Sequence, residues 1–348
     1  MYALFDRPRL SSLLIGVTTC LLSPFALADT ASARWYAGIA GGYEALADSS
    51  RNLEQAADRF CAAPSANPHE RARLESAWAD AFFDWQRVRF VDFGPVKQDS
   101  LSWQLQFWPD PKNLVGKKVR ARFDGDQPIS AESIAGDSVA IKGFPAVEYL
   151  LFDEQFEQSP NALPASRSCA LLTAITAHIR ANSGRLVADW ARFRPHFVEQ
   201  DRYADDTVLA AMHALELMKD RRLGAPMGAA GKGRRNPYLS DAWRSGQSMT
   251  SLKASLEGIR DMFLPGLALR LDSEQGQTLY QRFSRQLAAA IERLDSLSHD
   301  ISPLLDDTAG YRQLQLLLLD IERLNTQLSG SIAPELGVVK GFNSSDGD

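Results

Sequence analysis

The sequence predicts an all-α protein with two domains that each resemble a four-helix bundle. Apolar residues recur at helical spacing through most of the 348-residue chain. Strand patterns are scarce, and no Asn-Gly or Asp-Gly turn joins two alternating segments. Hydrophobic residues make up 45% and charged residues 23% of the chain, which is typical of a globular protein with a sizeable core.

The first 28 residues are predicted to be a signal peptide. Arg7 and Arg9 form a basic start, residues 13–25 are mainly apolar, and Ala26-Leu27-Ala28 is a small-x-small cleavage site. A membrane anchor would need about 20 apolar residues, so this run is too short. Cys20 leaves a lipoprotein as an alternative. We therefore expect a periplasmic protein, with association to the outer membrane left open and no transmembrane segment after cleavage.

The overall charge is weakly acidic. The chain has 38 basic and 43 acidic residues and a net charge of −5, and cleavage of the signal peptide would make it more negative. A nucleic-acid-binding protein would favour a basic face. We expect a monomer with no nucleic-acid partner.

The N-terminal bundle is predicted over residues 29–195. Its second helix should begin after Asn67, because Asn67 can cap a helix and Pro68 is tolerated in the first turn. The last helix should end before Pro195, which interrupts the hydrogen-bond ladder. Residues 94–130 are rich in proline and glycine and are predicted to be mostly irregular. The expected helices cover residues 32–62, 68–91, 130–141, 145–153 and 166–193.

The C-terminal bundle is predicted over residues 196–340, with a disordered tail at 341–348. The glycine-rich segment 224–238 should be a mobile loop. It lacks the Gly-Lys-Ser/Thr end of a phosphate-binding loop, so a phosphate site is not expected there. The expected helices cover residues 205–223, 240–263, 273–300 and 308–328.

Two cysteines remain after the predicted cleavage, Cys61 and Cys169. An export signal implies an oxidising compartment, so the pair is predicted to form a disulfide. The alternative is two buried free thiols.

The segment Gly143-Phe-Pro-Ala-Val-Glu-Tyr-Leu-Leu-Phe152 carries the strongest functional signal. Gly143 and Pro145 form a helix start, since a proline in the first turn loses no hydrogen bond. Glu148 lies among apolar residues, and a buried carboxylate needs a charge or hydrogen-bond partner. Arg87 and Arg89 are candidate partners. A salt bridge that orients two helices and a ligand-binding role both stay open for Glu148.

His213 and Glu216 form a second candidate pair, three positions apart on one helix face. These two residues and Glu148 are weak candidates as metal ligands, because a catalytic zinc site usually has three protein ligands. The chain has no His-Glu-x-x-His motif, and its other histidines are scattered. Classical zinc proteolysis is therefore poorly supported.

Several stretches together resemble the imelysin-like family over roughly residues 33–335. The family signature is a glycine, any residue, a histidine, two further residues and a glutamate, followed by an aromatic residue and two leucines. The segment above fits it, except that Pro145 stands in place of the histidine. The other similar stretches are residues 82–95, 107–110, 223–226 and 241–248.

The resemblance implies an all-helical, exported protein associated with iron uptake, from a family classed as peptidases. It also implies a site beside the signature, between two helical bundles. Pro145 removes one of the two signature side chains, which argues against metal binding and peptidase activity. The site residues assigned by resemblance are Gly143, Glu148, Arg89, Arg244, Ser245 and Ser248.

The leading hypothesis is a periplasmic binding or accessory protein of imelysin-like type, linked to iron acquisition and not an enzyme. An arginine-lined cleft would suit an anionic ligand or a chelated metal better than a bare cation. Iron or another divalent cation is the candidate cofactor, and iron-uptake or envelope proteins are candidate partners. Two alternatives stay open: a metallopeptidase with an atypical site, for example at His213 and Glu216, and an envelope scaffold without a small ligand.

Overall fold

The computed structural model describes residues 1–2, 30–63, 67–125, 127–229 and 233–339. Residues 3–28 of the predicted signal peptide and the predicted tail at 341–348 lie outside these ranges, so both stay predictions. All the regular secondary structure in the described ranges is helical, which confirms the all-α prediction. None of the described helices is both long and apolar enough to cross a bilayer.

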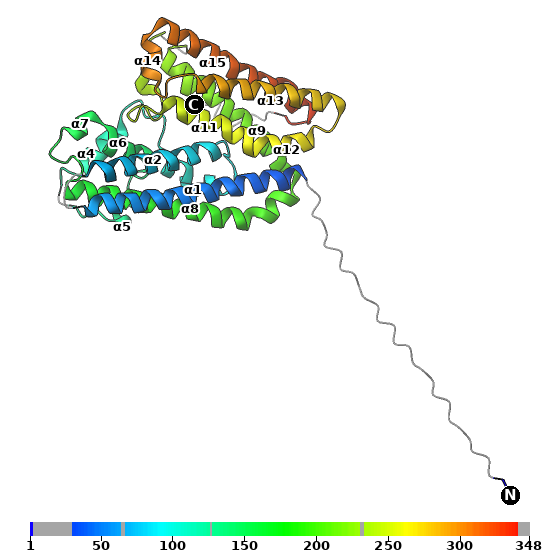
Figure 1. Cartoon of the computed structure of the whole chain (residues 1–348), viewed down its shortest axis with the longest axis horizontal. Helices are drawn as coiled ribbons and strands as arrows, with labels where there is room; N and C mark the ends of the chain where they lie inside the picture. Colours follow the sequence, from blue (N-terminus) through cyan, green and yellow to red (C-terminus); the bar gives the residue numbers. More distant parts are fainter. Residues whose placement is uncertain (3–29, 64–66, 126, 230–232, 340–348) are drawn as a thin grey trace.

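One layer of the molecule is built on three long helices, α1, α2 and α8, with shorter helices grouped at one end (Figure 1). The first of these packs against the other two along its length. The elements of this layer are α1 (Ala31–Ala62), α2 (Pro68–Val88), η1 (Gly94–Ser100), α3 (Leu101–Leu105), α4 (Leu114–Ala121), α5 (Ala131–Ala135), η2 (Val139–Ile141), α6 (Phe144–Phe152), α7 (Glu154–Glu157) and α8 (Ser166–Glu199).

The second layer packs on the first and is formed by the C-terminal half of the chain (Figure 1). In it α15 packs against α13 and α14, and the two layers meet where α11 packs on α2 and α12 packs on α1. The division into two domains near residue 195 stays a prediction. The elements are α9 (Asp201–Leu217), η3 (Met218–Gly224), α10 (Ala225–Met227), η4 (Pro237–Leu239), α11 (Ser248–Gly258), η5 (Ile259–Phe263), α12 (Leu264–Arg270), α13 (Glu274–Asp295), α14 (Ile301–Asp306), α15 (Thr308–Gln327), η6 (Leu328–Ile332) and α16 (Ala333–Glu335).

The prediction that residues 94–130 are mostly irregular is wrong. This stretch contains η1, α3 and α4, none of them longer than eight residues. Such short helices show no apolar period, and among the three only α4 begins at a side-chain cap. Asn113 caps α4 through its side-chain oxygen, which accepts from the Gly116 N–H at 3.2 Å.

The prediction that the long helix ends before Pro195 is also wrong, because α8 continues to Glu199. A proline removes only one backbone hydrogen bond so close to a helix end. Beyond it, Phe197 is fully buried and lies 5.3 Å from Trp190 and 5.9 Å from Phe93, measured between ring centroids. We attribute the extra turn to this aromatic packing.

The predicted disulfide between Cys61 and Cys169 is confirmed. It joins α1 to α8 across 108 positions of sequence, with the two Cα atoms 5.5 Å apart. A loop of that length corresponds to about 4–5 kcal/mol of stabilisation in the chain-entropy model. The same helix pair also shares a buried hydrogen bond of 3.0 Å between Ser50 and Ser183.

The two layers approach closely at glycines. A Cβ atom on Gly258 of α11 would lie 1.8 Å from the backbone oxygen of Arg87 in α2. A Cβ on Gly266 of α12 would lie 2.4 Å from the Trp35 indole of α1, whose Nε1 donates to the Phe263 carbonyl at 2.6 Å. The absence of a side chain at these positions lets the backbones meet, which sets the distance between the layers.

We expect Gly258→Ala to destabilise the protein by about 1–3 kcal/mol, because the new methyl group meets backbone and cannot be relieved by a rotamer change. The matched control is Gly184→Ala in α8, where a Cβ meets nothing within 4 Å. That change should stabilise the helix by about 0.5–1 kcal/mol. Urea unfolding of both variants measures the difference, and equal stability of the two would contradict this account of the interface.

Candidate functional site

Helix α6 carries the signature segment and presents Glu148 toward the second layer. Gly143 is its N-cap, and Pro145 lies in its first turn, as the sequence predicts. A Cβ on Gly143 would lie 2.1 Å from the Leu105 carbonyl oxygen, so only glycine allows α6 to pack against α3. Trp78 of α2 donates from its indole N–H to the Phe144 carbonyl at 3.1 Å, which ties the start of α6 to the core.

The segment 240–247 faces Glu148 and is a loop, so the prediction that a helix begins at residue 240 is wrong. Ala242 and Gly246 have positive φ values of 50° and 66°, which interrupt any helix. The Ser245 backbone N–H donates to Glu148 Oε1 at 3.0 Å, and the Ser245 hydroxyl donates to the same oxygen at 2.9 Å. These tertiary hydrogen bonds replace those that a helix would have made.

Glu148 is a buried carboxyl whose side chain is held by hydrogen bonds instead of a direct salt bridge. Its residue is 4% exposed. Burial raises the pKa of Glu148, and the positive charge of Arg244 and the two hydrogen bonds from Ser245 oppose that shift. The negative charge of Asp241 raises the pKa further. The site therefore favours a protonated carboxyl more than water does.

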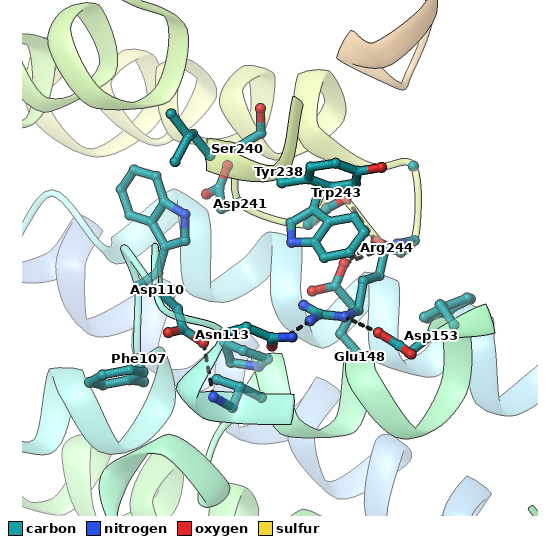
Figure 2. Close-up of a pocket in the computed structure, with 18 of the residues that line it drawn as sticks. Phe107, Asp110, Asn113, Glu148, Asp153, Tyr238, Ser240, Asp241, Trp243 and Arg244 are labelled. Atoms are coloured by element: carbon teal, nitrogen blue, oxygen red, sulfur yellow. Dashed lines mark hydrogen bonds and ion pairs between the residues drawn. The ribbon is translucent and has the colours of Figure 1, made fainter. Parts of the chain in front are cut away.

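Arg244 joins the 240–247 loop to the first layer through two hydrogen bonds. Its Nε donates to Asp153 Oδ2 at 2.8 Å, and its Nη2 donates to Asn113 Oδ1 at 3.0 Å (Figure 2). Both partners are helix caps, because Asp153 accepts from Phe156 N in α7 and Asn113 caps α4. The guanidinium also lies 4.2 Å from the ring centroid of its neighbour Trp243.

These elements enclose a cavity of 710 Å³, which we call the Glu148 cavity (Figure 2). Helix α6 and the 107–113 segment line it from the first layer, and the 236–246 loop lines it from the second. Pro145 lines it next to Glu148. The aromatic residues in its wall are Phe82, Phe107, Trp108, Phe152, Tyr238 and Trp243.

Carboxylates outnumber basic groups in the described wall of the Glu148 cavity. Arg244 is its one lysine or arginine, and it already pairs with Asp153. The expectation of an arginine-lined cleft for an anionic ligand is therefore wrong for this cavity. The acidic lining residues are Asp110, Glu148, Asp153, Glu154, Asp241 and Asp300.

The family model for imelysin matches residues 39–328 of this chain, which is most of its length. The chain belongs to the imelysin family. No curated protein matches it in sequence.

Two solved structures share the imelysin fold with this chain. An imelysin-like protein from Psychrobacter arcticum is 20% identical with a TM-score of 0.77, and the match covers 89% of this chain and 98% of that one. A protein described as an iron-regulated protein A precursor, from Parabacteroides distasonis, is 14% identical with a TM-score of 0.64 and covers 88% and 95%. At these identities the likeness shows the fold alone.

Only some of the site residues that were assigned by resemblance line the Glu148 cavity. Glu148, Arg244 and Ser245 line it, whereas Gly143 serves the packing of α6. The buried Ser248 hydroxyl accepts from the Ile301 N–H at 3.0 Å and so anchors the start of α14.

The predicted pairing of Glu148 with Arg87 or Arg89 is wrong. Arg87 pairs with Asp84 at 2.8 Å and with Glu257 at 3.3 Å. Arg89 lies 3.7 Å from Asp241 and lines a different cavity. Arg244 of the 240–247 loop takes their place near Glu148, and its positive charge opposes the rise in the pKa of Glu148.

The donor set of this imelysin does not fit a hydrolytic metal. Pro145 offers no ligand atom beside Glu148, and no group of three or more His, Cys, Asp or Glu side chains within the described ranges could hold a metal ion. His213 instead pairs with Asp92 at 2.8 Å, and this contact raises its pKa. His213 lines the second cavity and not the Glu148 cavity, so the proposed His213–Glu216 site lies apart from the signature.

The sequence analysis missed Asn113, Asp153 and Tyr238, which all line the Glu148 cavity. The local signal for the first two was present, since both residue types are good helix caps. Their pairing with Arg244 spans 131 and 91 positions and leaves no local trace in the sequence.

Replacing Glu148 by glutamine should make stability less dependent on pH. A carboxyl with a raised folded-state pKa binds protons more readily when folded, so its stabilising effect is lost as the pH rises from the unfolded pKa through the folded one. Glutamine can still accept from Ser245 and does not ionise. We therefore expect Glu148→Gln to gain stability relative to the parent protein as the pH rises above about 4, the ordinary pKa of a glutamate.

Urea unfolding at several pH values in this range measures the difference between the two proteins. The matched control is Glu132→Gln, which changes an exposed carboxyl in α5 that lines neither cavity. A stability difference for Glu148→Gln that stays constant, or that shrinks with rising pH, would rule out the proposed ionisation penalty.

Proposed function

We propose that this imelysin is an exported, non-enzymatic binding protein linked to iron acquisition, and that its ligand occupies the Glu148 cavity. The observation that carries the proposal is a buried, hydrogen-bonded carboxyl facing a cavity of 710 Å³ with aromatic walls. Small-molecule sites combine aromatic side chains with a few fixed polar groups, and the exposed surface of this wall is more polar than apolar.

The size of the cavity favours a molecule over a bare ion. Small-molecule pockets usually have about 300–1,000 Å³, whereas metal ligands surround an ion at about 2.0–2.6 Å. A bare ion would also need several converging donors, and Pro145 removes one from the position next to Glu148. Iron would therefore enter this cavity as a complex that already satisfies most of its coordination.

The charge of the wall favours a neutral or positively charged ligand. Asp241 and Asp153 are paired with arginines, which leaves Glu148 as a buried acid without a direct ion pair. A positive ligand beside it would lower the pKa of Glu148 and favour the ionised form. Tyr238 and Trp243 pack edge to face at 4.8 Å and can cover an organic part of the ligand or its cationic edge.

Export and the link to iron rest on separate support. The Cys61–Cys169 disulfide fits an oxidising compartment, as does the predicted signal peptide. The protein from Parabacteroides distasonis, which shares the fold, is described as iron-regulated. We infer periplasmic residence from the disulfide and the predicted signal peptide, and a role in iron acquisition from the description of that protein.

Isothermal titration of the mature protein tests the ligand class. We expect binding of neutral and positively charged iron complexes, and no binding of ferric, ferrous or zinc ions or of anionic complexes. Glu148→Gln should weaken binding of a positive complex by about tenfold or more, because a charge-assisted contact of about 1.5–3 kcal/mol is lost. Glu132→Gln, the exposed control, should bind like the parent protein.

Two results would overturn the proposal. One is no heat from any iron complex in the panel. The other is a stoichiometric transition-metal ion bound at Glu148 together with chelator-sensitive cleavage of a protein substrate, which would support the peptidase alternative.

A further inference from the structure

A second cavity lies on the other side of Asp241 and is lined by none of the residues that hold Glu148. Its volume is 310 Å³, and it is formed by the end of α2, the 90–109 segment, α9 and η3. The side chains of Trp103, Trp108, Leu217 and Met218 supply much of an apolar wall. We call it the Arg89 cavity.

Two guanidinium groups share one carboxylate at the buried end of the Arg89 cavity. Arg222 Nη2 lies 2.9 Å from Asp241 Oδ2, and Arg89 Nη1 lies 3.7 Å from the same oxygen. Arg89 otherwise contacts Gln86 at 3.4 Å and lies over the Trp108 ring at 5.4 Å. One carboxylate cannot neutralise two guanidinium groups, so the cluster keeps one excess positive charge.

Burial makes that excess charge costly. Arg222 is 4% exposed, and its Nε is buried without a hydrogen-bond acceptor among the described residues. Desolvation and the neighbouring charge of Arg222 lower the pKa of Arg89 to about 10, against the opposing effect of Asp241. A buried cation is stabilised by a second anion with hydrogen-bonding oxygens. Among the residues that the structure describes, Asp241 is the one carboxylate that pairs with Arg89 or Arg222.

The backbone around this cluster is also unusual. Arg222 lies in η3, a seven-residue π-helical segment that continues α9. Short π-helical insertions in α-helices are frequent at functional sites. Here the insertion places Arg222 against Ser255 and Ser251 of α11, which accept from its Nη1 and Nη2 at 2.6 Å and 3.0 Å.

We propose that the Arg89 cavity binds a small monocarboxylate with an apolar body, whose carboxylate meets Arg89 and Arg222 and whose body packs between Trp103, Trp108 and Leu217. A carboxylate fits a guanidinium in a two-pronged arrangement, and the apolar wall selects against inorganic anions. The volume suits a molecule of roughly the size of an aryl-alkanoic acid.

The mouth of the cavity favours the approach of an anion. Lys97 is exposed there, and His213 pairs with Asp92 beside it. Trp103 is 44% exposed, which leaves an apolar surface at the entrance for the body of the ligand. The site is separate from the proposed iron-complex site, so either proposal can fail without the other.

Titration calorimetry of the mature protein with 4-phenylbutyrate, 4-phenylbutan-1-ol and 4-phenylbutylamine tests the proposal. We expect the acid to bind and the alcohol and amine, which have the same body, to bind about tenfold more weakly or not at all. Arg89→Met should weaken acid binding by about tenfold or more while keeping the fold, because Arg222 and Asp241 remain as a balanced pair. The matched control is Arg194→Met, which removes an exposed arginine that also lies over an aromatic ring, Tyr36.

A second variant keeps the test decisive if Arg89→Met fails to fold. Ala214 lines the cavity from α9, so Ala214→Phe should fill the space and block the acid without removing any charge. No detectable binding of the acid, equal binding of acid and alcohol, or unchanged binding by folded Arg89→Met or Ala214→Phe would each overturn the proposal.

Discussion

The ion pair between Arg222 and Asp241 is the constraint on which both cavities depend. Each side chain is less than 5% exposed, and removal of either partner would leave an uncompensated charge in the interior. The pair fixes the start of the 240–247 loop against η3. With that end fixed, Ser245 reaches Glu148 and Arg244 reaches the caps of α4 and α7. The position of the 240–247 loop in the wall of the Glu148 cavity therefore depends on the buried Arg222–Asp241 ion pair.

Glu148 shows how a buried acid can be retained without a salt bridge. The Ser245 hydroxyl lies 2.9 Å from Glu148 Oε1 and 3.1 Å from the Ala242 carbonyl, and its single proton can serve only one of them. An ionised Glu148 accepts that proton, whereas a protonated Glu148 can donate to the hydroxyl while Ser245 donates to Ala242. Both protonation states are thus satisfied in one geometry. The state that a ligand selects would depend on the charge it brings to the cavity.

The sequence predicts the long helices well and the loops that build the site poorly, for a physical reason. Helices such as α1 and α15 bury one regular stripe of apolar residues, which local spacing reveals. The 240–247 segment has a spacing compatible with a helix, and its loop conformation is decided by Glu148 and Arg222, which are distant in sequence. Of the residues assigned by resemblance, Glu148, Arg244 and Ser245 line the Glu148 cavity. Resemblance could not separate them from Ser248, which accepts a hydrogen bond from Ile301.

The two cavities lie on opposite sides of Asp241 and differ in charge. Gln106 and Trp108 line both cavities, so the same two side chains form part of the wall between them. On one side carboxylates predominate around Glu148, and on the other two guanidinium groups share Asp241. Because the interior screens charge weakly, an anion beside Arg89 would draw positive charge away from Asp241 and so raise the effective negative charge felt at Glu148. Occupancy of the Arg89 cavity by a carboxylate would therefore favour a cationic ligand in the Glu148 cavity, which links the two sites through one shared acid.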